Sequence, residues 1–345
     1  MNKTNLQDIK KSMMTGITNP IVRKYMESIN VEIKRPLGKF NIWAWWVELV
    51  RGCNLACWHC PTRLLPKNKI LFMTEDVWLS MLKVIKEVTP RTRLEFGNAG
   101  EPTLHPALLE YLKLARKICP DIQILTYTNG TKLIEGSLTY KQLFDAGLNR
   151  VFVDMYSPYI EHKKLAKESG YSWFYQDTKS VNDTNVFSNC HKPDSHIIML
   201  AENPSHWSHR KLSRGYLSTF FNDLDWSVAI KHGLKPTANP IERKCDLPFK
   251  FINVNYDGSF VFCCFDYMRH TIENFGNINE GLEAFINFWF GKYMQNTRKN
   301  VADKNRKLHE YCAKCSFTSV RCDIPCWSEE VLNQYWKNNG WHNCE

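Results

Sequence analysis

Three cysteines early in the chain, Cys53, Cys57 and Cys60, are spaced Cys-x3-Cys-x2-Cys. Three thiolates on one short loop can hold three irons of a cubane [4Fe–4S] cluster and leave the fourth iron open to another ligand. The alternatives are a zinc site and three free thiols. Zinc normally takes a fourth protein ligand, and His59, between two of the cysteines, is poorly placed to complete one tetrahedron. The spacing therefore favours a cluster with an open iron.

A second segment with chemical potential is Gly97–Pro102, which reads Gly-Asn-Ala-Gly-Glu-Pro and follows an expected strand. Its small residues would let the backbone approach a ligand closely. The carboxylate of Glu101 could accept hydrogen bonds from a cationic amino group, and such charge-assisted bonds are shorter and stronger than neutral ones. Alone, the segment also fits an ordinary strand-to-helix loop. Its place after the cysteine triad favours ligand binding.

The C-terminal part of the chain carries eight further cysteines, seven of which form a spaced pattern: Cys245, Cys263, Cys312, Cys315, Cys322, Cys326 and Cys344. They suit iron–sulfur clusters, and the alternative is a zinc knuckle made by Cys312, Cys315, Cys322 and Cys326. Between the first two, the pair Asp257-Gly258 predicts a β-hairpin with a type I′ turn. That hairpin would present Cys263.

The elements that must position these residues alternate between strands and helices. We expect strands at 41–50, 93–96, 122–127, 151–155 and 196–200, and helices at 75–88, 106–118, 140–146 and 160–169. This alternation predicts parallel βαβ units, in an α/β sheet or barrel. Residues with chemical potential follow the strand ends, where such folds carry their chemistry: Cys53, Glu101, Asn129 and Tyr156. In the first strand, Trp43, Trp45 and Trp46 are expected in the core rather than in a base-stacking platform.

Length and composition limit the class of protein. With 345 residues, of which 43% are hydrophobic, the chain can bury a core and suits about two domains. A chain of this length needs no disulfide scaffold for its 13 cysteines. We see neither a membrane-spanning run nor a secretory signal, and expect a cytoplasmic protein with reduced thiols. The net charge of +10 suits an acidic peptide, a nucleotide or a nucleic acid without choosing among them.

The cysteine triad after the first strand resembles that of the radical S-adenosylmethionine (SAM) enzymes. In that family the open iron binds the amino and carboxylate groups of SAM. An electron from the cluster cleaves SAM, and the resulting 5′-deoxyadenosyl radical abstracts hydrogen from a substrate. The resemblance implies a partial (β/α)6 barrel at 41–240, after an N-terminal extension at 1–40. It also implies a catalytic [4Fe–4S] cluster on Cys53, Cys57 and Cys60.

The same resemblance implies the contacts to SAM. The segment at Gly97–Pro102 is similar to the family's Gly-Gly-Glu-Pro motif, and Thr128-Asn129-Gly130 is similar to the end of its third strand. Residues 211–215 could add a basic contact to the SAM carboxylate, or form an ordinary surface loop. The residues expected to contact SAM are His59, near the adenine, Asn98, Ala99, Gly100, Glu101, Asn129 and, on the fourth strand, Asp154.

The C-terminal cysteines resemble those of the SPASM domain, which carries auxiliary [4Fe–4S] clusters, and imply such a domain at 241–345. One spacing is six residues here instead of the usual five. The resemblance gives a first cluster to Cys245, Cys263 and Cys326, and a second to Cys312, Cys315, Cys322 and Cys344. The first set lacks a fourth ligand. Cys264 could supply it, but adjacent strand residues point to opposite faces, which favours an open iron. The alternative is a truncated SPASM domain with only one auxiliary cluster.

The family implies reductive cleavage of SAM, with an electron from a reductant such as flavodoxin or ferredoxin. The substrate would be a peptide, a protein or a small molecule that is oxidised. We expect no separate leader-peptide-binding domain before the first strand, which weakens the peptide interpretation. One alternative is modification of a nucleotide or nucleic acid, and another is a non-catalytic iron–sulfur electron carrier. No catalytic acid or base can be assigned from the sequence.

Overall fold

The computed structural model describes most of the expected barrel and part of the cysteine-rich region. The described residues are 42, 44–57, 60, 62, 65, 69–90, 92–97, 100–155, 159–176, 196–202, 245, 247–264, 266, 269, 275–309, 311–315 and 341–343. The expected N-terminal extension, Tyr156 and the loop at 211–215 lie outside them and stay predictions. So do several expected site residues: His59, Asn98, Ala99, Cys322, Cys326 and Cys344.

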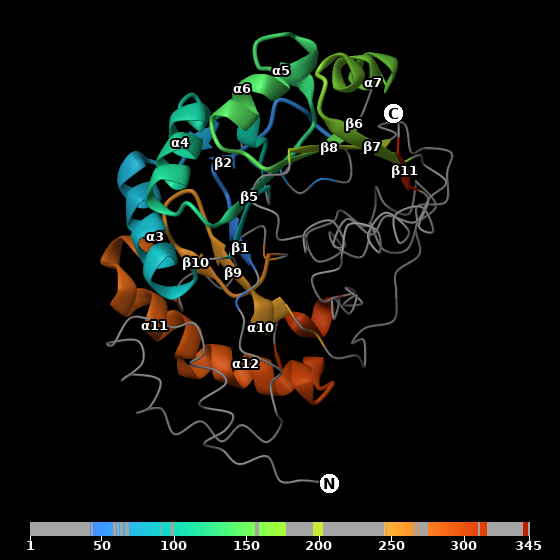
Figure 1. The fold of residues 1–345 in the computed structure, drawn as a ribbon. Helices are drawn as coiled ribbons and strands as arrows, with labels where there is room; N and C mark the ends of the chain where they lie inside the picture. Colours follow the sequence, from blue (N-terminus) through green and yellow to red (C-terminus); the bar gives the residue numbers. More distant parts are fainter. Residues whose placement is uncertain are drawn as a thin grey trace, which may run out of the picture.

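A sheet of nine strands forms the centre of the molecule, in the order β10-β9-β1-β4-β5-β6-β8-β7-β11 (Figure 1). Six parallel strands make the expected partial barrel: β1 (Ala44–Val47), β4 (Arg93–Phe96), β5 (Gln123–Thr128), β6 (Arg150–Met155), β8 (Ile197–Glu202) and β7 (Ser172–Gln176). The fold class predicted from the sequence is confirmed. A separate small sheet pairs β2 (Val50–Arg51) with β3 (Leu71–Phe72).

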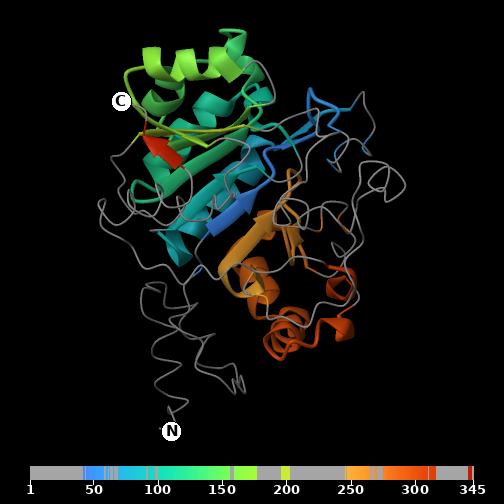
Figure 2. The same ribbon diagram turned by 90° about the vertical axis from the view of Figure 1, so that its right-hand side faces the viewer.

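The cysteine-rich region continues the same sheet. Strand β9 (Phe251–Val254) pairs with β1 in parallel, and β10 (Phe260–Val261) pairs with β9 antiparallel. At the other edge, β11 (Trp341–Asn343) pairs antiparallel with β7. Figure 2 shows the hairpin beside β1, with helices of the C-terminal part below it. These are α10 (Leu247–Lys250), α11 (Leu282–Phe290) and α12 (Lys292–Ala302).

Helices between the barrel strands cover one face of the sheet (Figures 1 and 2). They are α3 (Glu75–Val88), α4 (Leu108–Ile118), α5 (Thr131–Ile134), α6 (Tyr140–Asp145) and α7 (Tyr159–Glu168). Helix α3 has acidic residues in its first turn and buries apolar residues at helical spacing, which fixes its face. Its Trp78 stacks on Tyr111 of α4 at 5.3 Å and meets Phe96 of the sheet at 5.6 Å.

The two faces of the sheet differ because strand side chains alternate. Trp45 is fully buried on the helix side, where its ring stacks on Phe285 of α11. Trp46 points the other way and is only partly buried. The expectation of a core position is confirmed for Trp45, whereas Trp46 is partly buried and packs against the core from the other face, and Trp43 lies outside the described residues.

Two local expectations also need correction. Strand β7 was not expected, and β8, which follows it in the chain, lies between β6 and β7 in the sheet. The hairpin of β9 and β10 forms, but without a type I′ turn. Such a turn needs positive φ at both central residues, whereas here Gly258 has φ +85° and Asp257 does not have positive φ. The loop instead closes with the Gly258 N–H donating to Asn255 at 2.9 Å.

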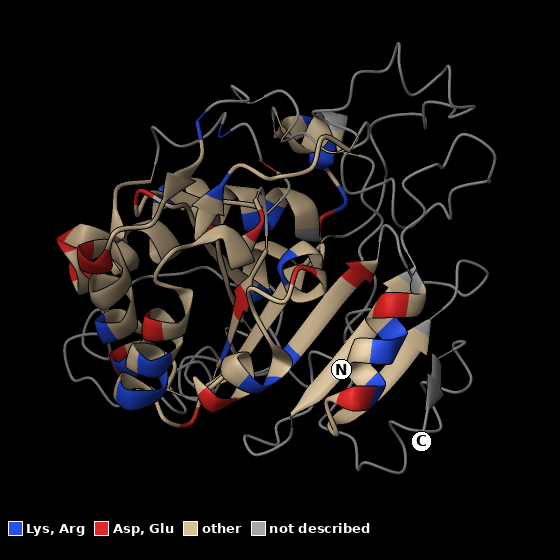
Figure 3. Cartoon of the chain, turned by 90° about the horizontal axis from the view of Figure 1, so that it is seen from above, with Lys and Arg blue, Asp and Glu red and all other residues tan. Residues whose placement is uncertain are grey.

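Charges of both signs are interspersed on the helices of the described part (Figure 3). Helix α7 alternates Glu161 and Glu168 with lysines, and α3 carries Glu75 and Asp76 at one end and Lys86 at the other. These helices thus lack the single-sign surface typical of nucleic-acid binding. Among the described residues, no helix is long and apolar enough to cross a membrane.

Candidate active site

The loop after β2 holds the first three cysteines close together. None of the three forms a disulfide and all are half-buried, and a turn is closed by the Cys60 N–H donating to the Cys57 carbonyl at 3.1 Å. The pKa of Cys53 is raised to about 12, mainly by burial and to a smaller extent by the charges of Glu101, Cys60 and Cys57, while a backbone N–H from Leu55 opposes the increase. The three sulfurs are thus near enough to affect one another's ionisation, as ligands of one cluster must be.

The loop that carries Glu101 touches this cysteine loop backbone to backbone. Gly52 and Gly100 form an isolated parallel bridge, and the Glu101 N–H donates to the Gly52 carbonyl at 3.0 Å. A Cβ at Gly100 would lie 1.7 Å from the carbonyl oxygen of Val50. Glycine is therefore needed at Gly100 because two loops meet there, whereas the sequence had suggested only close approach to a ligand.

The carboxylate of Glu101 is almost fully buried and well supplied with donors. Its Oε1 accepts three hydrogen bonds: from the N–H of Thr103 at 3.0 Å, from the Thr103 hydroxyl at 2.6 Å and from the Thr128 hydroxyl at 2.6 Å. Its Oε2 accepts one, from the N–H of Asn129 at 2.7 Å. Burial raises the pKa of Glu101, and these donors oppose the increase. The hydrogen bonds are thus shared unevenly, and Oε2 is the oxygen with fewer donors.

Asn129 links this carboxylate to the first cysteine. Its side-chain amide donates to the sulfur of Cys53 at 3.6 Å and to Asn54 Oδ1 at 2.8 Å. Its Oδ1 accepts the N–H of Thr131 at 3.0 Å, which fixes the orientation of the amide. Cys53, Glu101 and Asn129, which come from the three motifs, thus meet at one place. Thr103 and Thr128 were not expected as partners, although Thr128 stands beside Asn129 in the quoted motif.

The sheet face opposite the helices carries polar and aromatic groups near the carboxyl ends of its strands. The next-to-last residues of β1, β5 and β6 are the partly exposed ones in otherwise buried strands: Trp46, Tyr127 and Asp154. Between them Glu95 of β4, almost fully buried, accepts hydrogen bonds from the indole of Trp46 and from Arg93 Nε at 2.7 Å. The Tyr127 hydroxyl donates to the same carboxylate at 3.4 Å.

Tyr127, on this face, has a strongly raised pKa. Burial raises its pKa well above the usual value, and the charges of Glu95 and Asp154 add to the effect, while Arg93 opposes it. The phenol therefore stays protonated and available as a donor. Its ring stacks on Phe152 at 4.8 Å, which holds it toward the face. We call Trp46, Glu95, Tyr127 and Asp154 the inner-face group; the sequence analysis had included only Asp154.

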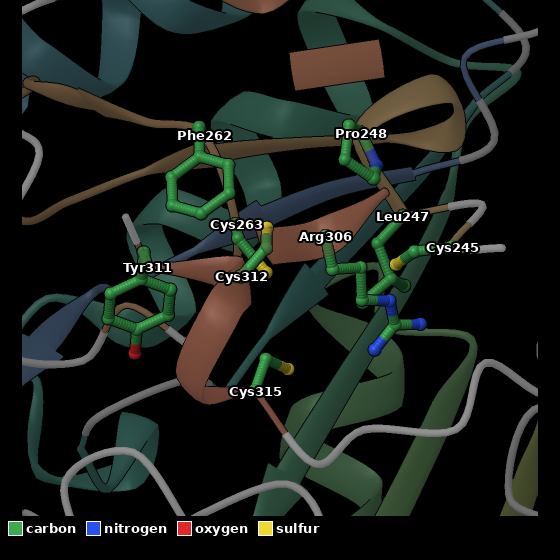
Figure 4. A pocket seen from close by; sticks show the side chains of 9 residues that line it. All are labelled: Cys245, Leu247, Pro248, Phe262, Cys263, Arg306, Tyr311, Cys312 and Cys315. Carbon is green, nitrogen blue, oxygen red and sulfur yellow. The ribbon is translucent and has the colours of Figure 1, made fainter. Parts of the chain in front are cut away.

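A second site lies in the cysteine-rich region. Four cysteines from three separate segments line one pocket (Figure 4). Cys245 precedes α10, Cys263 follows β10, and Cys312 and Cys315 belong to the turn at 312–315. The wall is completed by Leu247, Pro248, Phe262, Arg306 and Tyr311. Among the described residues, no three Cys, His, Asp or Glu side chains are grouped closely enough for a single metal ion.

The pKa of Cys245 is raised to about 12 and that of Cys312 well above its usual value, mainly by burial. The charges of neighbouring pocket cysteines contribute to both increases, and Arg306 opposes them. The neighbouring Cys264 is buried but does not line the pocket. This grouping joins two cysteines that the resemblance gave to the first cluster with two that it gave to the second.

Two family models match the chain. Residues 47–183 match the Radical SAM superfamily, and residues 245–316 match SPASM, an iron–sulfur cluster-binding domain. The chain belongs to the radical SAM superfamily. As a radical SAM enzyme with a SPASM domain, it uses [4Fe–4S] clusters and SAM as cofactors. Both the family and the cofactors predicted from the sequence are confirmed.

Relatives of this radical SAM enzyme differ in the extent of their similarity. The S-adenosyl-L-methionine-dependent 2-deoxy-scyllo-inosamine dehydrogenase of Niallia circulans is 21% identical over 280 residues, which are 80% of this chain and 94% of the relative. A GTP 3′,8-cyclase of Sulfurovum sp. is 29% identical over 128 residues, 35% of this chain and 37% of the relative. The crystal structure of BtrN in complex with AdoMet and 2-DOIA aligns with a TM-score of 0.57 and 18% identity, over 81% of this chain and 95% of that one.

Proposed function

We propose that this radical SAM enzyme oxidises a small hydroxylated molecule. The observation that carries the proposal is the pocket of four thiols beside a barrel whose inner face is polar. A relative aligned over 94% of its own length is a dehydrogenase of an inosamine, which is a small molecule of this kind. An oxidation removes two electrons, and an auxiliary cluster offers a place for an electron to go.

The catalytic cluster would be held by Cys53, Cys57 and Cys60. These thiols fit the group because three cysteines outside any disulfide share one loop, and no fourth cysteine stands among them. When bound, the cluster with SAM supplies a carbon-centred radical that takes hydrogen from the substrate. Because the pKa of Cys53 is about 12 in the protein without iron, its proton must leave as iron binds. The Asn129 amide then donates to a thiolate, which it stabilises.

Glu101 would take the amino group of SAM on its Oε2, the oxygen that accepts a single hydrogen bond in the protein. The three donors on Oε1 hold the carboxylate in place and favour its charged form. Gly100 lies next to it on the loop that bridges to the cysteines, and Asp154, near the carboxyl end of β6, would contact the far end of the cofactor. His59, Asn98 and Ala99, outside the described residues, complete the proposed SAM contacts.

An auxiliary cluster would be held by Cys245, Cys263, Cys312 and Cys315. Their four sulfurs suit one closed [4Fe–4S] cluster, whose four irons each take one thiolate. Cys322, Cys326 and Cys344 remain for the second auxiliary cluster that the SPASM resemblance implies, in residues outside the described part. A flavodoxin or ferredoxin would supply the electron that starts each turnover.

The inner-face group would form the surface that binds the substrate. Glu95 is held by Arg93, so its charge is balanced and its position fixed. The indole of Trp46 and the hydroxyl of Tyr127 both donate to that carboxylate, and both residues are partly exposed. A ring with several hydroxyl groups matches such a surface, since aromatic faces contact its C–H groups and carboxylates accept its O–H groups.

The test is anaerobic incubation of the iron-loaded protein with dithionite, SAM and a panel of cyclitols, aminocyclitols and sugars. We expect 5′-deoxyadenosine to form faster with a true substrate, together with a product two hydrogens lighter. The variant with all three of Cys53, Cys57 and Cys60 replaced by alanine should be inactive yet retain C-terminal iron. Stimulation by peptides or nucleotides alone would contradict the substrate class. No SAM cleavage under any condition would favour a non-catalytic electron carrier.

A further inference from the structure

Arg306 is a buried cation at the four-cysteine pocket. It begins a short 3-10 turn (Arg306–Leu308), is 1% exposed and lines the pocket. In Figure 4 its side chain lies between Cys312 and Cys245. Its guanidinium carries a positive charge. Burying it costs free energy unless negative groups compensate.

Arg306 shares the pocket lining with Cys245, Cys263, Cys312 and Cys315. Three of these cysteines, Cys245, Cys263 and Cys312, are buried as the arginine is. A charge at a site shielded from water acts on its neighbours with little screening by salt.

A second buried arginine nearby has a different task. Arg298 donates from Nε to the Pro248 carbonyl at 2.8 Å and from Nη1 to the Trp289 carbonyl at 2.6 Å, and its guanidinium lies 4.1 Å from the centre of the Trp289 ring. It thus supports the pocket wall from behind, whereas Arg306 is itself a lining residue.

We propose that Arg306 raises the reduction potential of the auxiliary cluster held by Cys245, Cys263, Cys312 and Cys315. A [4Fe–4S] cluster with four thiolates carries a net charge of about −2 when oxidised and about −3 when reduced. A fixed buried cation stabilises the more negative state more, so it makes the cluster a better electron acceptor. This inference rests on the proposed function of the four cysteines, and it adds the residue that adapts their cluster to oxidation.

The experiment measures the midpoint potential of the auxiliary cluster by a redox titration followed by EPR. The full chain is used, with Cys53, Cys57 and Cys60 replaced by alanine so that the catalytic cluster adds no signal. Arg306→Gln should shift the midpoint to a more negative value while iron per chain is retained. Arg306→Lys keeps the charge and should stay close to the parent. Lys307→Gln is the matched control, because it removes an equal but exposed charge from the same turn and should change nothing.

The outcomes distinguish failure of the proposed cluster site from failure of the proposed role of Arg306. A parent protein that binds no C-terminal iron, or loses none on replacement of Cys263 and Cys312, refutes the proposed cluster site itself. If Arg306→Gln binds iron normally and its midpoint potential is unchanged, only the role of Arg306 is refuted. The same follows if Arg306→Lys shows a negative shift as large as that of Arg306→Gln. If Arg306→Gln loses its cluster, Arg306→Met, which retains the apolar stem, replaces it. Loss of iron in both neutral variants would assign Arg306 to cluster assembly and overturn the proposal.

Discussion

Asn129 donates its backbone N–H to Glu101 at 2.7 Å, and its side-chain amide reaches the sulfur of Cys53. One residue at the end of β5 thus connects the carboxylate proposed to bind SAM with the first proposed ligand of the cluster. The positions of SAM and of the cluster are therefore coupled through one side chain. A substitution of Glu101 should therefore affect the cluster site at Cys53, and a substitution of Cys53 should affect the site at Glu101.

Replacing Glu101 by glutamine should weaken SAM binding about tenfold or more, because a charge-assisted hydrogen bond is worth roughly 1.5–3 kcal/mol. The new amide group must also face donors from Thr103, Thr128 or Asn129, so we expect some loss of stability. Calorimetry on the iron-loaded protein measures the dissociation constant. Glu110→Gln, on the exposed side of α4, is the control and should bind SAM normally. Unchanged affinity in Glu101→Gln would exclude the contact.

Gly100→Ala should disrupt the contact between the two loops. The added Cβ would lie 1.7 Å from the Val50 carbonyl oxygen, so the backbone has to move. We expect a loss of about 2–4 kcal/mol of stability and poor iron loading at the cysteine triad. Gly136→Ala is the comparison, since no atom lies within 4 Å of its added Cβ and only the cost of its positive φ, about 1–2 kcal/mol, applies. Equal effects of the two substitutions would show that the loop contact has little weight.

Glu48, directly after β1, should make stability depend on pH. Burial raises its pKa from 4.5 to about 7, although Arg51, the Tyr256 N–H and Arg269 oppose the increase. The folded protein thus holds a proton that the unfolded chain has lost between these values. Its contribution to stability is complete below pH 4.5 and declines as the pH rises to about 7.

Glutamine cannot ionise, so the stability of Glu48→Gln relative to the parent should increase across this window. The expected change is on the order of 2–3 kcal/mol, given about 1.4 kcal/mol for each pKa unit. Urea unfolding of the anaerobic, iron-loaded protein at a series of pH values measures it. Glu87→Gln, which alters an exposed carboxylate on α3, should show no such trend. A parallel pH dependence of parent and Glu48→Gln would refute the assignment.

Iron counting tests the grouping of the C-terminal cysteines. One catalytic and one auxiliary cluster predict about eight irons per chain, and a second auxiliary cluster about twelve. Cys263→Ala should lose the pocket cluster, whereas Cys264→Ala should keep its iron and its Mössbauer spectrum, because Cys264 does not line the pocket. Loss of a cluster in Cys264→Ala would make it a ligand instead.

The sequence was sufficient for the elements whose periodicity is strong. Helix α3 and strand β4 begin and end where their patterns predict. Strand β7 was not expected, since its pairing with β8 is a long-range contact that a short aromatic segment does not reveal. Apart from Asp154, the inner-face group was not expected either, because alternation shows that Trp45 and Trp46 lie on opposite faces but not which of them meets the helices. The grouping of Cys312 with Cys245 depends on how distant segments pack, which spacing alone does not contain.

The pairing of β9 with β1 has a consequence for how the protein is made. Val254 lies opposite Val47. One edge of the first barrel strand therefore stays unpaired until more than 200 later residues have left the ribosome. Until then its backbone groups are open to wrong partners, including the same strand of another nascent chain. We expect C-terminal truncations before β9 to aggregate even though every barrel strand is present. The cysteine-rich region would then act first as the part that completes folding.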